Sequence, residues 1–386
     1  MLELFIDKQD NKKRIALVED SSLVEFYEET ENDNRNEGNI YVGVVKDIVK
    51  GMESAFVDIG TEKNSFIHLV DLLPKIDLKK KQENIKTTIG NVVKTGEKIL
   101  VQVKKDSNET KGARISEHIN LPSKYIVLMP NTDIITISQK IEDSKEQERL
   151  IKLVKENLSE GNGAIIRTSA KGKNEEIVKD IQKIENKWKI IKQESEQYTG
   201  NTPKLIYKAE SIDEKILLDI ESNCLDTIIV NDQEEYNRIQ EYGDYKIDFI
   251  EGNILEKYNL EDQIEKISNR KVWLNCGGFI TIDKTEALTA IDVNTGKFTG
   301  KDKLNETVLK VNKEATMEIA KQLRLRDIGG IIIIDYIDMK DEKDKEEIQD
   351  LLKKCLKKDR SKTQVEGFTK LDLMEMTRKH ICSHKI

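Results

Sequence analysis

The chain reads Ala287-Leu288-Thr289-Ala290-Ile291-Asp292-Val293-Asn294 and, further on, Ile331-Ile332-Ile333-Ile334-Asp335-Tyr336-Ile337-Asp338. Both stretches are apolar, rich in β-branched residues and run into a carboxylate, which predicts two buried strands. A crossover unit with a helix between two strands normally places the strands parallel in one sheet. We expect Gly329-Gly330 to stop that helix. The helix itself is predicted by apolar residues at three- and four-residue spacing: Leu304, Val308, Val311, Ala315, Ile319 and Leu323.

Two carboxylates come together in this arrangement. Asp292 and Asp335 would lie at the carboxyl edge of the sheet, where open α/β sheets place their sites. Close carboxylates repel unless a proton or a cation intervenes, and oxygen ligands favour Mg²⁺, with Mn²⁺ as the alternative. Asn294 lies two residues after Asp292 and points to the same side of an extended chain. The alternative is that Asp292 and Asp335 each merely cap the end of a strand. Asp338 is either a structural carboxylate or part of the site.

The bulk composition describes a polar but globular chain. It has 386 residues, enough for two or three domains, with 35% charged and 37% hydrophobic residues. The net charge of −8 is unlike a typical nucleic-acid-binding domain, although local patches decide binding. No apolar stretch is long enough for a membrane span, and the N-terminus lacks the features of a signal peptide. We therefore expect a cytoplasmic protein.

Cysteine usage gives no sign of a metal or disulfide framework. The four cysteines, Cys224, Cys276, Cys355 and Cys382, form no C-x-x-C pair. We expect reduced thiols and no zinc site in this chain.

The pattern along the chain predicts an α/β protein built from several sections. A hairpin-like opening is followed by dense β-structure, and a third section combines strands with helices at about 143–159 and 173–197. Buried strands then return, for example Thr227-Ile228-Ile229-Val230-Asn231. The five expected sections are 1–35, 36–118, 119–212, 213–276 and 277–386.

The second section predicts a small barrel. Its five short strands with glycine turns fit a Greek-key barrel of the oligonucleotide-binding kind. Phe56 and Phe66 lie on consecutive strands, where they either stack on bases or pack in the core. The stretch resembles an S1 RNA-binding domain, in which the two aromatics face RNA. Lys105 and Lys111 would then contact phosphates.

Basic residues elsewhere are weaker signals. Arg167-Thr168 combines a planar fork of donors with a hydroxyl, which suits a phosphate, but the dipeptide alone favours a solvated arginine. Lys321, Arg324 and Arg326 crowd the end of the connecting helix and could also meet phosphate.

The whole chain resembles the ribonuclease E/G family of bacterial endoribonucleases. The densest matches are Leu288 to Asn294, Ile319 to Gly330 and Ile333 to Met339. The resemblance implies an RNase H-like subdomain (1–35 and 213–276) with an inserted S1 domain (36–118) and 5′ sensor region (119–212). A DNase I-like catalytic subdomain (277–386) follows.

The resemblance also implies roles for individual residues. Asp292 and Asp335 would bind the catalytic Mg²⁺, and Asn294 would support them. A sensor for a 5′-monophosphate would use Arg167 and Thr168, with Val127 as its apolar wall.

Several positions depart from the family pattern. Ser123 stands where the sensor usually has glycine, Gln139-Lys140 replaces paired arginines, and Lys362 replaces a further arginine. The Cys-Pro-x-Cys zinc link expected after the catalytic section is absent, and Cys382 alone does not supply it. If a homodimer forms, we expect it to form by another route.

The resulting hypothesis is a Mg²⁺-dependent endoribonuclease that cleaves single-stranded RNA in RNA processing and decay, including rRNA processing and mRNA decay. The resemblance implies a preference for 5′-monophosphorylated and AU-rich substrates, with 5′-phosphate and 3′-hydroxyl products. Two rivals remain. One is a non-catalytic S1-domain RNA-binding protein, and the other is a DNA nuclease on the same catalytic fold.

Overall fold

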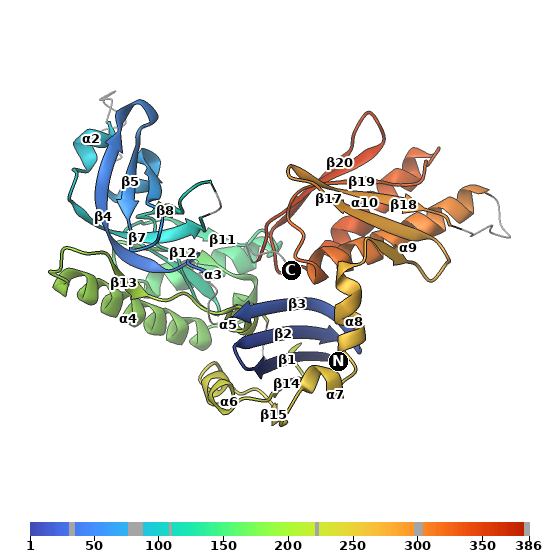
Figure 1. Cartoon of the computed structure of the whole chain (residues 1–386), viewed down its shortest axis with the longest axis horizontal. Helices are drawn as coiled ribbons and strands as arrows, with labels where there is room; N and C mark the ends of the chain where they lie inside the picture. Colours follow the sequence, from blue (N-terminus) through green and yellow to red (C-terminus); the bar gives the residue numbers. More distant parts are fainter. Residues whose placement is uncertain (31–34, 76–87, 108–109, 221–223, 297–303, 382–386) are drawn as a thin grey trace. The chain divides into compact units, whose positions relative to one another are not determined.

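The chain divides into two compact units (Figure 1). In this computed structural model, unit 1 comprises Met1–Asn32 and Ser222–Ile386, and unit 2 comprises Asp33–Glu221. Both units combine helices with sheets, which confirms the predicted α/β class. The structure describes residues 1–30, 35–75, 88–107, 110–220, 224–296 and 304–381.

The first sheet of unit 1 joins distant parts of the sequence. Its strand order is β15-β14-β1-β2-β3, with β1, β2 and β3 antiparallel and with β14 and β15 parallel to β1. The chain therefore leaves this sheet after β3 and returns to it at β14. The strands are β1 (Leu2–Gln9), β2 (Lys12–Glu19), β3 (Ser22–Thr30), β14 (Thr227–Val230) and β15 (Ile247–Phe249). The short helices of this part are α6 (Gln233–Gln240), α7 (Ile254–Lys257), α8 (Glu261–Glu265) and η5 (Lys266–Ser268).

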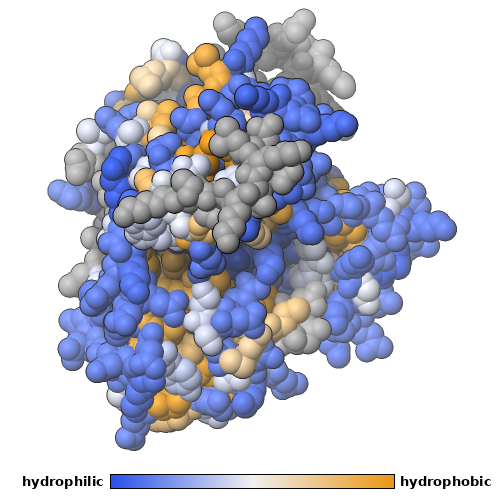
Figure 2. Space-filling model, turned by 90° about the vertical axis from the view of Figure 1, so that its right-hand side faces the viewer, coloured by the Kyte–Doolittle hydropathy of each residue, from blue (hydrophilic) through white to orange (hydrophobic). Residues whose placement is uncertain are grey.

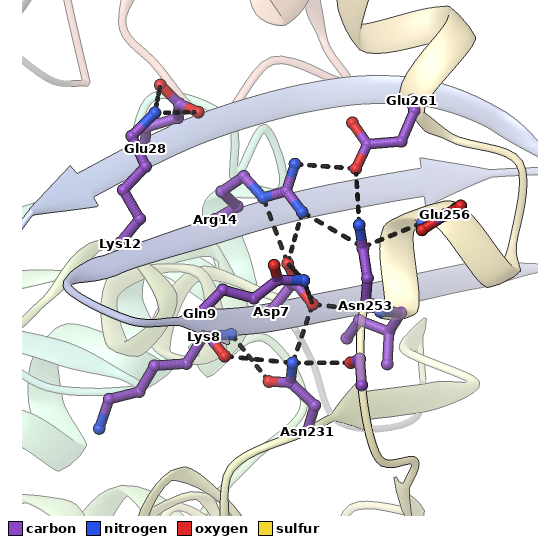
Figure 3. A network of polar contacts seen from close by, with 12 residues as sticks. Asp7, Lys8, Gln9, Lys12, Arg14, Glu28, Asn231, Asn253, Glu256 and Glu261 are labelled. Carbon is purple, nitrogen blue, oxygen red and sulfur yellow. Dashed lines mark hydrogen bonds and ion pairs between the residues drawn. The ribbon is translucent and has the colours of Figure 1, made fainter.

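A buried carboxylate ties these helices to the sheet (Figure 3). Asp7 on β1 is fully buried and accepts a hydrogen bond of 2.6 Å from Arg14 Nη2 on β2. Asn231 Nδ2 and the Ile254 backbone N–H donate to its other oxygen at 2.9 and 3.1 Å. Arg14 Nη1 also donates to Glu261 of α8 at 2.9 Å. Since breaking a buried ion pair costs about 3–5 kcal/mol, this network is a structural link.

The second sheet of unit 1 contains the two predicted strands that carry Asp292 and Asp335. β18 and β19 are parallel neighbours, and α9 connects them, which confirms the predicted crossover. Buried side chains of α9 pack against the sheet at the predicted spacing: Val311, Ala315, Ile319 and Leu323. The order is β16-β17-β18-β19-β21-β20. The elements are β16 (Lys271–Trp273), β17 (Phe279–Lys284), β18 (Leu288–Asn294), α9 (Leu304–Leu325), β19 (Gly330–Asp335), α10 (Glu342–Leu356), β20 (Thr363–Phe368) and β21 (Leu373–Arg378).

The predicted glycine stop of α9 was wrong. The helix ends at Leu325, and Asp327 already has a positive φ of 43°. Asp327 is held there by Arg378 Nη1 at 2.7 Å. Gly329 instead permits a close approach, because a Cβ on it would lie 2.7 Å from the His380 ring.

The barrel lies in unit 2. β4, β5, β6, β8 and β7 pair in that order, and β7 pairs back to β4, which closes the five-stranded barrel predicted from the sequence. Its core is formed by alternating residues such as Val57, Ile67 and Val101. The elements are β4 (Ile40–Val49), η1 (Lys50–Met52), β5 (Ser54–Asp58), β6 (Ser65–His68), η2 (Leu69–Lys75), α2 (Ile89–Val92), β7 (Lys98–Lys105), β8 (Arg114–Ser116) and β13 (Lys204–Tyr207), which pairs antiparallel with β4.

A four-stranded sheet forms the rest of unit 2, with the order β11-β12-β10-β9. The two helices predicted near 143–159 and 173–197 are confirmed as α3 and α4. Helix α4 buries one stripe against the sheet: Ile177, Ile181, Ile184, Trp188 and Ile191. The elements are β9 (Leu121–Pro122), β10 (Ile126–Pro130), β11 (Ile135–Ile137), α3 (Ser144–Asn157), β12 (Asn162–Ile166), η3 (Thr168–Ala170), α4 (Glu175–Gln197) and α5 (Ile212–Asp219).

Hydrophilic side chains cover most of the face drawn in Figure 2, with smaller hydrophobic areas between them. In the described part of the chain, every helix is too short or too polar to cross a bilayer.

Candidate active site and nucleic-acid interface

Asp292 and Asp335 lie side by side at the end of two parallel strands. The register of β18 and β19 pairs them directly, so the two Cα atoms belong to one rung, with strands about 4.8 Å apart. Their neighbours Ile291 and Ile334 are buried in the core, which turns both carboxylates to the solvent face. The predicted juxtaposition of the two aspartates is therefore present.

Asn294 adds an amide to the same face. Its Nδ2 donates a hydrogen bond of 2.5 Å to Asp292 Oδ2. Val293 between them is buried, as strand alternation requires. The amide thus fixes the orientation of one carboxylate and leaves the other oxygen of Asp292 for a ligand.

The electrostatics of the pair favour a cation. Burial raises the pKa of Asp335, and the charges of Asp292 and Asp338 raise it further. Asp338 therefore lies close enough to add to the negative potential. A group of three or more His, Cys, Asp and Glu side chains with metal-ligand geometry is absent from the described residues. Mg²⁺ is commonly held by one or two carboxylates and water, so the donor set fits this ion.

The basic residues at the end of α9 contact other side chains of the protein. Lys321 Nζ lies 2.5 Å from Ser22 Oγ, and Arg324 pairs with Glu25 of β3 at 3.3 Å. Arg326 Nε donates to Gln322 at 2.6 Å. Each of the three side chains thus has a partner within the protein, and their contact with a phosphate stays a prediction.

Phe56 and Phe66 face outward from the barrel. They are directly paired across β5 and β6, and their ring centroids are 6.0 Å apart in an edge-on arrangement. Phe56 is 37% exposed, and the barrel core consists of other residues. The alternative of two core aromatics is excluded.

Basic side chains lie in the same row of the barrel surface as the two aromatic residues. Phe66 pairs with Arg114 of β8, and Arg114 pairs with Lys105 of β7. Lys105 and Lys111 are both exposed, as phosphate contacts require. Sequence reasoning missed Arg114, which is 56% exposed and forms an ion pair with Asp71 at 3.0 Å. Its alternation with the buried Ile115 was the available signal.

Val127 lies on β10, and Arg167 directly follows the neighbouring strand β12 in unit 2. Val127 pairs with Ile165, and the Arg167 N–H donates to Tyr125 O at 2.9 Å, which continues the ladder by one step. Strand alternation therefore puts Val127 and Arg167 on one face. Thr168 follows directly, and its Oγ1 lies 3.2 Å from Ser138 Oγ.

The side chain of Arg167 is already engaged. Its Nη1 donates to Ser123 O at 2.8 Å, and its Nη2 forms an ion pair with Asp219. Asp219 lies at the end of α5, and sequence reasoning did not find it. A phosphate at this site has to compete with, or share, that carboxylate.

The structure also shows where the residues that depart from the family pattern lie. Ser123 is buried, and its Oγ donates to Asp180 at 2.5 Å. Gln139, Lys140 and Lys362 are exposed. Cys224 is exposed, Cys276 and Cys355 are partly buried, and Cys382 lies outside the described residues.

A closed five-stranded barrel with outward aromatics is consistent with the barrels that bind single-stranded nucleic acid. A carboxylate pair suited to Mg²⁺ is typical of enzymes that cleave phosphodiesters. Together they define a nucleic-acid-processing enzyme. A family model described as "Ribonuclease E/G family" matches residues 120–381.

Individual proteins agree with the family model. Ribonuclease G of Escherichia coli strain K12 is 38% identical over 98% of this chain and 79% of its own length. Ribonuclease G of Haemophilus influenzae gives the same identity and coverage. Ribonuclease E of Nostoc sp. is 36% identical over 89% of this chain and 51% of its own length. The chain belongs to the ribonuclease E/G family, which confirms the predicted family and enzyme class.

Proposed function

We propose that the chain is a Mg²⁺-dependent endoribonuclease that cleaves single-stranded RNA and leaves a 5′-phosphate and a 3′-hydroxyl. The observation that carries this proposal is the direct pairing of Asp292 with Asp335, with Asn294 bonded to Asp292. Membership of the ribonuclease E/G family supports RNA as the substrate.

Each site residue has a distinct task in this mechanism. Asp292 and Asp335 hold the ion and present it at the solvent face of the sheet. Asn294 keeps the Asp292 carboxylate in the ligating orientation. Bound there, Mg²⁺ would polarise the scissile phosphate and lower the pKa of a water molecule. Attack in line with the leaving 3′-oxygen then breaks the P–O bond and gives the proposed ends.

The barrel supplies strand binding. Phe56 and Phe66 stack on bases, which contributes about 1–3 kcal/mol per base. Lys105 and Lys111 neutralise phosphates, and this part of the affinity falls as salt rises. The net charge of −8 does not oppose this, because the cations are local to the aromatic row.

A 5′-monophosphate preference is the finer part of the proposal. Arg167 and Thr168 offer a guanidinium and a hydroxyl on one turn, and Val127 lies on the same face. Arg167 exchanges its ion pair with Asp219 for the terminal phosphate, or extends it through the remaining N–H groups.

We also assign the subdomains by their sheets. The β15-β14-β1-β2-β3 sheet corresponds to an RNase H-like subdomain formed by 1–35 and 213–276. The barrel corresponds to an S1 domain (36–118), and the α3/α4 section to a 5′ sensor region (119–212). The six-stranded sheet of unit 1 corresponds to a DNase I-like catalytic subdomain (277–386).

The two rivals differ from this proposal in measurable ways. A non-catalytic RNA-binding protein has no need of paired, outward carboxylates at one sheet edge. A DNA nuclease would cut duplex DNA as readily as RNA.

One assay separates the three. The purified chain is incubated with a 5′-monophosphorylated single-stranded RNA, the 5′-hydroxyl form of that RNA and duplex DNA, each with Mg²⁺ or with EDTA. We expect Mg²⁺-dependent cleavage of RNA alone, faster for the 5′-monophosphate. RNA binding without cleavage would favour the scaffold, and equal cutting of duplex DNA would favour the DNA nuclease.

A further inference from the structure

A pair of aromatic side chains, Trp273 and Phe279, lies on the sheet that carries Asp292 and Asp335, with Trp273 two strands away from Asn294 and Phe279 one strand away. Trp273 ends β16 and is 62% exposed, which is unusual for so large an apolar side chain. Its ring meets that of Phe279 on β17 edge-on, with centroids 5.4 Å apart. Neither ring belongs to the core of the sheet.

The strand registers place this pair on the catalytic face. Phe279 pairs with Trp273 on one side and with Asn294 on the other. Side chains on directly paired residues share a face, and so the two rings stand on the face that carries Asp292. Two strand spacings separate Trp273 from Asn294, which is about 10 Å. An RNA strand lying across this face meets the rings next to the reacting phosphate.

A cation completes the patch. Lys271 Nζ lies 3.9 Å from the Trp273 ring centroid and 3.5 Å from the Phe279 ring centroid. Lys271 also occupies the same row as Asp292, through Thr281 of β17. Among the described residues, no carboxylate forms an ion pair with it, and its charge is available to a phosphate. Arg270 next to it, by contrast, is neutralised by Asp283 at 2.5 Å.

We propose that Trp273, Phe279 and Lys271 form a nucleotide subsite that stacks the base next to the scissile phosphate and contacts its backbone. Trp273 supplies the stacking surface, and Phe279 packs edge-on against its ring. Lys271 moves away from the two rings to bind a phosphate. The subsite rests on the proposed endoribonuclease function, because it requires a strand that crosses the carboxylate pair. Its residues position the substrate and take no part in the chemistry.

The test is a double-mutant cycle between protein and RNA. Wild-type protein and Trp273→Ala are assayed on a single-site RNA and on versions with an abasic nucleotide at each position flanking the cleavage site. We expect Trp273→Ala to lower kcat/KM by about 5- to 160-fold, the range that loss of one stacked base produces. At one position the abasic RNA should lower wild-type kcat/KM by a similar factor and add little to the Trp273→Ala loss.

Matched variants make the cycle specific. Trp273→Phe keeps a stacking ring and should retain most of the activity. Phe249→Ala removes another exposed aromatic of unit 1, 42% exposed and packed edge-on against Tyr236, and should change nothing. Additive losses at every abasic position, or wild-type kcat/KM in Trp273→Ala, overturn the subsite.

Fluorescence gives a readout that does not depend on cleavage. The chain has two tryptophans, and the other, Trp188, is only 8% exposed. RNA should quench the emission of the wild-type protein and leave that of Trp273→Phe nearly unchanged. Quenching without any cleavage by wild-type protein would contradict the proposed function but not the binding subsite. Cleavage without quenching would contradict the subsite alone. If the wild-type protein dimerises as its concentration rises and Trp273→Ala does not, the patch is a contact between two copies of the chain. That result would overturn the nucleotide subsite.

Discussion

Asn294 shows how one amide tunes the candidate metal site. Its hydrogen bond to Asp292 fixes a ligand without adding charge. We expect Asn294→Ala to weaken metal affinity about 10- to 100-fold, the usual cost of removing a group that orients a ligand. The variant should then need more Mg²⁺ for half-maximal cleavage and recover activity at high Mg²⁺. A Mg²⁺ titration of the cleavage rate measures this.

Gln233→Ala is the control for Asn294→Ala, because it removes an exposed amide from α6 of the same unit. An unchanged Mg²⁺ dependence in Asn294→Ala would show that the hydrogen bond to Asp292 has no part in metal binding.

Arg167 tests the 5′ sensor separately from the chemistry. Arg167→Ala removes a charged donor, and such hydrogen bonds contribute about 1.5–3 kcal/mol. The variant should lose the advantage of 5′-monophosphorylated over 5′-hydroxyl RNA and cleave the latter at the wild-type rate. Competition between the two RNAs gives the ratio directly.

Arg149→Ala is matched to this variant, because Arg149 is another ion-paired arginine of unit 2, bound to Glu146. If Arg167→Ala slows both RNAs equally, its role is to stabilise the fold through Asp219 rather than to read the 5′ end.

At the residue scale, the sequence predicted those side chains whose position follows from the strand that carries them. The pairing of Asp292 with Asp335 follows from two strand ends and one crossover. Asp219 was not predicted, because this partner of Arg167 lies on α5 and no local sequence pattern indicates the ion pair. The outward direction of Phe56 also needed the structure, since core and surface aromatics look alike in a barrel strand.

At the element scale, periodicity predicted α3, α4 and α9 and the parallel strands around α9. The end of α9 was misjudged, because the helix stops where tertiary contacts at Asp327 and Arg378 hold the turn. No local pattern predicted the ion-pair partner of Arg324 either. This partner, Glu25, lies on β3, 299 positions before Arg324 in the sequence.

Glu25 makes the junction between α9 and the first sheet dependent on pH. It is 1% exposed and pairs with Arg360 at 2.6 Å and Arg324 at 3.3 Å. Burial opposes its charge, but the two arginines outweigh burial and lower the pKa of Glu25 to about 2. A lowered pKa stabilises the folded state above the unfolded value near 4.5, and this contribution is lost as the pH falls toward 2.

Urea unfolding of wild-type protein and Glu25→Gln measures this contribution. The wild-type advantage in unfolding free energy should be constant above pH 5 and shrink by about 3 kcal/mol as the pH falls through this window. Glu234→Gln, an exposed carboxylate on α6, should show little difference at any pH. A Glu25→Gln difference that does not change with pH would contradict the assigned pKa.

For the whole molecule, the section pattern and the long matching strings predicted an α/β chain of the ribonuclease E/G family, and the comparisons confirm the family. Local patterns could not supply the pairing of β14 with β1, which only the family resemblance implied by joining 1–35 to 213–276. The return of β14 beside β1 brings together segments more than two hundred positions apart, and no local signal encodes that pairing.

The central claim is that Asp292 and Asp335 hold the metal that cleaves RNA. The direct test compares Mg²⁺-dependent cleavage and RNA binding for Asp292→Asn, Asp335→Asn and the control Asp350→Asn, an exposed residue of α10. We predict that both site variants lose cleavage and keep nearly wild-type RNA affinity, while the control retains both. Wild-type cleavage by either site variant would contradict the claim.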